Sequence, residues 1–85
     1  MPEQPKNRIL VVEDDGAVRR AVERALTFEG YDVVTARDGA EALAIVLNDS
    51  IEAIVLDVMM PIVDGLEACR RIRARGDTTP ILILT

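Results

Sequence analysis

The stretch Ala53-Ile54-Val55-Leu56-Asp57 joins an unbroken aliphatic run directly to one carboxylate. Two more aliphatic runs of this kind occur in the chain, at residues 9–12 and 81–84. Apolar runs without polar alternation are typical of strands that are covered on both faces, as in a parallel sheet between helices. Residues 33–35 predict a weaker strand, nearer an edge of the sheet. The stretch at 53–57 therefore predicts a buried strand that ends in an acid.

Between these runs, apolar residues recur at helical spacing and predict three helices. They are Val18, Ala21, Val22, Ala25 and Leu26, then Ala40, Leu43, Ala44 and Leu47, then Leu66, Cys69 and Ile72. In the first helix Arg19, Arg20, Glu23 and Arg24 are expected to face away from the sheet. Asp15 and Gly30 are expected to cap and end it, and Asp64 and Gly76 to do the same for the third helix. The order β-α-β-α-β-α-β predicts an α/β fold with a doubly wound parallel sheet.

Composition narrows the class of protein. The chain has 85 residues, enough for one domain, and a net charge of −5, which argues against a nucleic-acid-binding surface. The arginines at 70–75 are expected to form a solvated helix end, with a partner-docking patch as the alternative. Cys69 is the only cysteine, so an internal disulfide is excluded. Residues 1–7 are expected to form a disordered N-terminal arm, and no apolar run is long enough to span a membrane, so we expect a cytoplasmic protein.

Acidic residues follow two of the predicted strands. Glu13, Asp14 and Asp15 come directly after the first strand, and Asp57 ends the third. Sites in open α/β sheets form at the carboxyl ends of the strands, so these acids converge if the two strands are neighbours. We expect no basic partner nearby, and an all-oxygen site of this kind suits Mg²⁺ together with a phosphate. The alternative is that the acids after the first strand are only loop and cap residues.

Four segments together resemble the receiver domains of bacterial response regulators in two-component signalling. They are Val11-Val12-Glu13-Asp14-Asp15, Leu56-Asp57-Val58-Met59-Met60-Pro61, Asp64-Gly65, and Pro80 through Thr85. Their order and spacing fit from about Arg8 to Thr85, so residues 8–85 are expected to be the N-terminal portion of a receiver domain. The resemblance implies the flavodoxin-like fold, with strand order 2-1-3-4-5 in a complete domain.

The resemblance also implies a role for individual residues. Asp57 would accept a phosphoryl group from the phosphohistidine of a sensor histidine kinase. Asp14 would bind Mg²⁺ directly, Glu13 would act on it through water, and Met59 would contribute its backbone carbonyl. The hydroxyl of Thr85 would sense the phosphoryl group after transfer. Pro61 and Gly65 match the residues that shape the loop above this site.

Complete receivers continue beyond the equivalent of Thr85, with a helix, a strand that bears a lysine before a proline, and a last helix. The only lysine here is Lys6, so we expect an incomplete receiver that lacks the last strand and the last two helices. Its strand at 81–84 is expected to pair with another chain, which predicts a homodimer or strand-paired oligomer. The resemblance is to the winged-helix transcription-factor branch, which implies contact with DNA only through an output domain absent from this chain.

Two other classes of function share part of this pattern. Haloacid-dehalogenase-like phosphatases also use an aspartate after a strand, but they need a second aspartate where this chain has Met59. A non-signalling assembly fragment with an inactive acidic pocket is the other alternative. We expect a phosphoacceptor module and not a turnover enzyme.

Overall fold

The computed structural model describes residues 7–57 and 62–84, without the side chains of 62–65. Residues 1–6 of the arm expected at 1–7 therefore lie outside the described residues, as do Met59, Pro61 and Thr85. The elements are β1 (Arg8–Val12), α1 (Gly16–Phe28), β2 (Asp32–Ala36), α2 (Gly39–Asn48), β3 (Ala53–Asp57), α3 (Ile62–Ala74) and β4 (Ile81–Leu84). This order confirms the predicted alternation of strands and helices.

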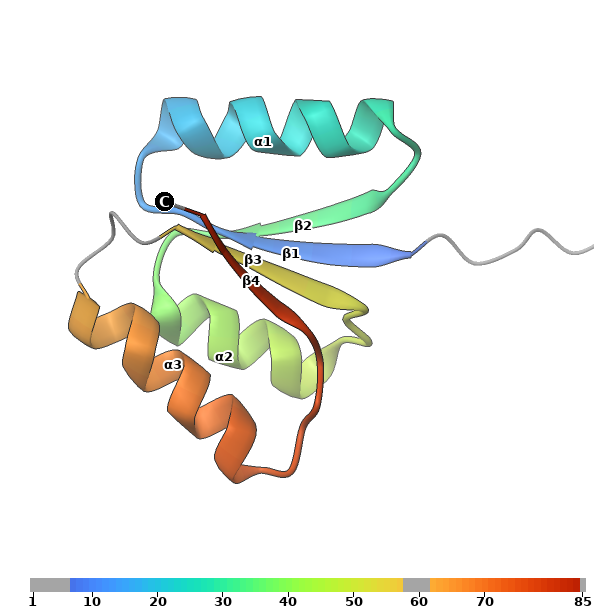
Figure 1. Ribbon diagram of the computed structural model, residues 1–85. Coiled ribbons are helices and arrows are strands. Elements are labelled where there is room, and N and C mark those ends of the chain that lie inside the picture. The colour runs from blue at the N-terminus through green and yellow to red at the C-terminus, as the bar shows by residue number, and fades with distance from the viewer. Residues whose placement is uncertain (1–6, 58–61, 85) are drawn as a thin grey trace, which may run out of the picture.

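The four strands form one parallel sheet in the order β2-β1-β3-β4. Figure 1 shows α1 on one face of this sheet, with α2 and α3 on the other. The doubly wound arrangement is therefore confirmed, and so is the position of the weak strand β2 at an edge. Strands β1 and β3 are direct neighbours, with Val12 paired to Leu56 in the register.

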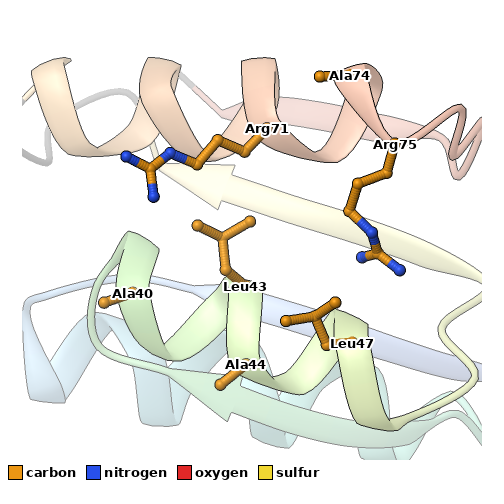
Figure 2. A pocket seen from close by; sticks show the side chains of 7 residues that line it. All are labelled: Ala40, Leu43, Ala44, Leu47, Arg71, Ala74 and Arg75. Atoms are coloured by element: carbon orange, nitrogen blue, oxygen red, sulfur yellow. The ribbon is translucent and has the colours of Figure 1, made fainter.

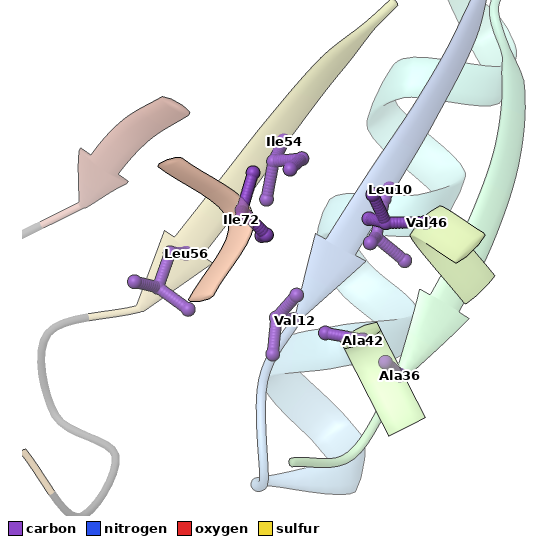
Figure 3. Close-up of a cluster of buried hydrophobic side chains, with 8 residues drawn as sticks. All are labelled: Leu10, Val12, Ala36, Ala42, Val46, Ile54, Leu56 and Ile72. Carbon is purple, nitrogen blue, oxygen red and sulfur yellow. The ribbon is translucent and has the colours of Figure 1, made fainter. Parts of the chain in front are cut away.

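The hydrophobic core lies between the sheet and the helix pair α2 and α3. It consists of Leu10, Val12, Ala36, Ala42, Val46, Ile54, Leu56 and Ile72 (Figure 3). Alternate residues of a strand point to opposite faces, so Leu10 and Val12 enter this core while Ile9 and Val11 point toward α1. All four residues of β1 from Ile9 to Val12 are buried, which explains why this strand carries no polar alternation.

Helix α1 begins and ends where its sequence signals predicted. The Asp15 side chain caps it by accepting hydrogen bonds from the backbone N–H groups of Ala17 and Val18. Gly30 follows its end with a φ of 99°, a conformation that glycine adopts without steric cost. The apolar stripe of α1 is nevertheless incompletely covered. Every residue of the helix is at least partly exposed, and Val18 is 45% exposed.

The predicted start of the third helix is wrong. Asp64 was expected as the N-cap, but α3 begins at Ile62, so Asp64 lies inside its first turn. A carboxylate is favourable both at the cap and in the first turn, since the helix dipole is positive there, and this signal alone does not fix the boundary. The other end is as predicted, with Gly76 at a φ of 80° after the helix.

Within the described ranges, no helix has the length and apolarity that crossing a bilayer requires.

Strand β4 lies at the open edge of the sheet and is poorly covered. Leu82 is 60% exposed, and Ile83 and Leu84 are also exposed. Helix α1 packs on β1 and β2, which leaves the same face of β3 and β4 without a helix among the described residues. The aliphatic run of β4 is typical of a strand covered on both faces, but the described residues leave Leu82, Ile83 and Leu84 exposed.

Candidate functional site

The acidic loop after β1 is fixed by backbone hydrogen bonds. The N–H of Glu13 donates to the carbonyl of Ala36 at 3.0 Å, which extends the pairing of β1 and β2 by one residue. The N–H of Asp15 donates to the Glu13 carboxylate at 3.0 Å. Glu13 is only 3% exposed. Its carboxylate is therefore held in place at the end of the sheet, one residue beyond the last pair of β1 with β3.

The structure brings together three of the carboxylates named from the sequence. The side chains of Glu13, Asp14 and Asp57 each offer an oxygen, and these oxygens all lie within 4.8 Å of one another. Glu13 is buried, Asp57 is partly buried and Asp14 is exposed, so the cluster reaches from the interior to the surface. Asp15 serves the helix as its cap and does not belong to this group.

The crowding of acids changes the protonation of Glu13. Its pKa is raised from 4.5 to about 7, first by burial and then by the side-chain hydrogen bond with Asp57. A hydrogen bond with Asp14 and the charge of Asp57 raise the pKa further, while the N–H of Asp15 acts in the opposite direction. Near neutral pH the metal-free cluster therefore holds a shared proton for much of the time.

A basic side chain lies beside the backbone of the loop that carries two of the acids. The guanidinium of Arg19 donates to the backbone carbonyl of Glu13 at 2.9 Å and approaches that of Asp14 at 3.5 Å. Arg19 was expected to face away from the sheet. Side chains on a helix point toward the N-terminus of that helix, and this direction brings the Arg19 guanidinium to the loop that precedes α1. An arginine near the start of a helix that follows an acidic loop makes this contact possible, but the sequence does not decide whether the side chain returns to the loop or extends into solvent.

Three further residues named from the sequence have no described place in the site. Met59, Pro61 and Thr85 lie outside the described residues. Gly65 lies within α3, where only its backbone position is described. Their expected roles as carbonyl ligand, loop residues and phosphoryl sensor stay predictions.

A hollow lies elsewhere, between α2 and α3 (Figure 2). Its volume is about 610 Å³, and it is lined by Ala40, Leu43, Ala44, Leu47, Arg71, Ala74 and Arg75. Arg71 also pairs with Glu67, at 3.8 Å, on the exposed surface of α3. The hollow is apolar apart from its two arginines, and none of the clustered carboxylates lines it. The clustered carboxylates therefore lie apart from this hollow, at the carboxyl edge of the sheet.

The arrangement of the acids limits what it can do. Two carboxylates about 4 Å apart repel by roughly 4 kcal/mol at an effective dielectric constant of 20. A proton or a cation relieves this repulsion. Oxygen ligands with exposed positions for water suit a hard divalent cation such as Mg²⁺, which also accepts phosphate oxygens.

Comparison with known proteins gives a consistent result. A family model described as the response regulator receiver domain matches residues 9–85. The chain is similar to Response regulator MprA of Mycobacterium sp. (strain KMS), with 58% identity over 78 residues. That match covers 92% of this chain and 34% of the relative, so the chain spans about a third of the length of MprA.

Solved structures agree in fold. TrrA in complex with the histidine kinase ThkA is 37% identical, with a TM-score of 0.82, and the match covers 93% of this chain and 68% of that one. TrrA from Thermotoga maritima in complex with Mg(2+)-BeF is 28% identical, with a TM-score of 0.75, and the match covers 93% of this chain and 87% of that one.

The raised pKa of Glu13 predicts an unusual dependence of stability on pH. The folded state holds a proton on Glu13 up to about pH 7, whereas the unfolded chain releases it near 4.5. Stability is therefore lost as pH rises through this window, by about 2 to 3 kcal/mol between pH 5 and pH 8. Urea unfolding of the metal-free protein in a chelating buffer measures this, and Glu13→Gln should remove the slope. An equal slope in Glu13→Gln would assign the effect to another group.

Proposed function

Because this chain belongs to the response regulator receiver domain family, we propose that it is the phosphoacceptor module of a cytoplasmic two-component system. Asp57 accepts the phosphoryl group from a sensor histidine kinase, and the acidic cluster binds the Mg²⁺ that this transfer requires. The observation that carries the proposal is the meeting of Glu13, Asp14 and Asp57 oxygens within 4.8 Å. The structures of TrrA with a histidine kinase and with Mg(2+)-BeF support the same assignment of partner and metal.

The ligand set fits Mg²⁺ by its chemistry. All three side chains offer carboxylate oxygens, the ligands that Mg²⁺ prefers, and Asp14 is exposed, which leaves room for water and phosphate. We assign direct binding to Asp14 and Asp57, binding through water to Glu13, and a carbonyl ligand to Met59. When bound, Mg²⁺ supplies positive charge that offsets the charge on the phosphoryl oxygens.

The chain supplies the nucleophile for the transfer. A carboxylate oxygen of Asp57 attacks the phosphorus in line, a new O–P bond forms, and the N–P bond of the kinase phosphohistidine breaks. The partial burial of Asp57 limits its hydration and so its shielding by solvent. The hydroxyl of Thr85 then binds the phosphoryl oxygens, which converts phosphorylation into a change of conformation. The product of the transfer is a covalent phosphoaspartate at Asp57. The chain turns over no substrate of its own.

The signal is proposed to pass to a DNA-binding output domain of a longer protein. The match to MprA leaves about two thirds of that relative outside this chain, which is compatible with a further domain there. A second candidate function is an assembly fragment with an inactive acidic pocket, and the exposed edge of β4 is the observation that favours it. Phosphorylation of Asp57 separates the two functions.

Mg²⁺ should bind weakly at the acidic cluster. A titration followed by amide NMR should move the signals of residues near Asp14 and Asp57, and Asp14→Ala should weaken binding at least tenfold, because it removes a charged ligand. Glu52→Ala is the matched control, since Glu52 is an exposed carboxylate outside the cluster. Shifts that survive Asp14→Ala unchanged would place the metal elsewhere.

In the full-length protein, Asp57→Asn should abolish labelling by acetyl phosphate or by a kinase, because the amide keeps the shape and lacks the nucleophile. Thr85→Ala should leave labelling largely intact but weaken the change of conformation that follows phosphorylation. Asp49→Asn, on the exposed surface, is the control and should label normally. Undiminished labelling of Asp57→Asn would refute the assignment of the phosphoacceptor.

The exposed edge of β4 predicts self-association of this 85-residue chain. Its outer edge has no strand partner among the described residues, and Leu82 is 60% exposed beside it. Unpaired backbone groups next to large aliphatic side chains favour pairing with a strand of another chain. Light scattering should show a dimer or larger species, and Leu82→Lys should shift it toward a monomer. A monomeric wild type with strong hydrogen-exchange protection at 81–84 would contradict this prediction.

A further inference from the structure

One side chain outside the acidic cluster contacts the loop that carries two of its members. Arg19 is the fourth residue of α1, and its Nη1 donates to the carbonyl of Glu13 at 2.9 Å. The same nitrogen lies 3.5 Å from the carbonyl of Asp14. The backbone N–H of Arg19 donates to the carbonyl of Asp15 at 2.9 Å. One residue thus contacts three successive carbonyls of the loop between β1 and α1.

The position of this guanidinium is unusual for a cation. It lies over the first turn of α1, because a Cβ built on Gly16 would be 3.5 Å from Nη2 of Arg19 and 3.2 Å from Nη1 of Arg20. The N-terminus of a helix carries partial positive charge, which disfavours a cation there. The carbonyls of the acidic loop compensate for this, and glycine at position 16 leaves space for the guanidinium.

We propose that Arg19 is a positioning residue for the metal site: by holding the carbonyls of Glu13 and Asp14, it fixes the direction in which their carboxylates leave the loop. The inference rests on the proposed function, because the site it positions is the proposed Mg²⁺ site. The position of the loop backbone bears directly on a carboxylate of the site. The N–H of Asp15, in the same loop, donates to the Glu13 carboxylate at 3.0 Å.

Positioning and charge make opposite predictions for this residue. If Arg19 acted only as a positive charge near the acids, its removal would strengthen the binding of a cation, since like charges repel. If it positions the loop, its removal weakens binding, because the carboxylates lose their preferred orientation. Groups that orient metal ligands from outside typically contribute about 10- to 100-fold in affinity.

The neighbouring Arg20 offers a matched control. It carries the same charge, its guanidinium also lies over Gly16, and it makes no hydrogen bond to the loop carbonyls among the described contacts. In the full chain, Mg²⁺ titration by amide NMR should show about tenfold weaker binding for Arg19→Gln. Arg20→Gln should bind as the wild type does, or slightly more tightly. Wild-type or tighter binding by Arg19→Gln would overturn the inference.

A metal-free measurement separates this inference from the proposed function. In Arg19→Gln the amide of Asp15 should exchange faster than in the wild type, while the amides of β1 and β3 keep their protection and so report an intact fold. Arg20→Gln should leave the Asp15 amide unchanged. Failure of the wild type to bind Mg²⁺ would refute the proposed metal site and the positioning of a metal with it. Normal Mg²⁺ binding with unchanged exchange at Asp15 in Arg19→Gln would refute the inference alone.

Discussion

The mutual repulsion of three carboxylates at the ends of β1 and β3 is the constraint on which the site depends. Their oxygens lie within 4.8 Å of one another, and one of the three side chains is almost fully buried. Burial of Glu13, then its hydrogen bond with Asp57, and after these the neighbouring acids raise its pKa to about 7, so in the metal-free protein Glu13 retains a proton to about that pH. A divalent cation bound there would take the place of that proton, so its binding would release the proton and stabilise the fold in the same step.

The fold keeps these acids together through the pairing of its two central strands. Val12 and Leu56 are partners in the register, so the residues that follow them leave the sheet side by side. Both of these residues lie in the core formed with α2 and α3. Packing therefore holds the strand ends close together against the repulsion of the acids that they carry, which is how a destabilising cluster persists in a small domain.

Much of this arrangement could be predicted from the sequence, because it depends on patterns that extend over whole elements. Unbroken aliphatic runs indicated a covered parallel sheet, and the acids at strand ends indicated where a site would form. The start of α3 could not be fixed, since Asp64 is as favourable in the first turn as at the cap. The position of Arg19 could not be fixed either, because a long side chain on an exposed helix face can extend to solvent or return to its own N-terminus. That choice depends on tertiary geometry.

The helices on the two faces of the sheet differ in how well their residues are buried, and this difference bears on the site. On one face α2 and α3 close a core around Leu10 and Ile72, whereas no residue of α1 on the other face is buried. The core on the face of α2 and α3 holds the ends of β1 and β3 together, and with them the acids. The loop that carries Glu13 and Asp14 also leads into α1. The links from α1 to this loop are the cap at Asp15 and the hydrogen bonds of Arg19. A partner that shifts α1 on its loosely packed face would therefore act on the carboxylates through these two residues, with the spacing of β1 and β3 unchanged.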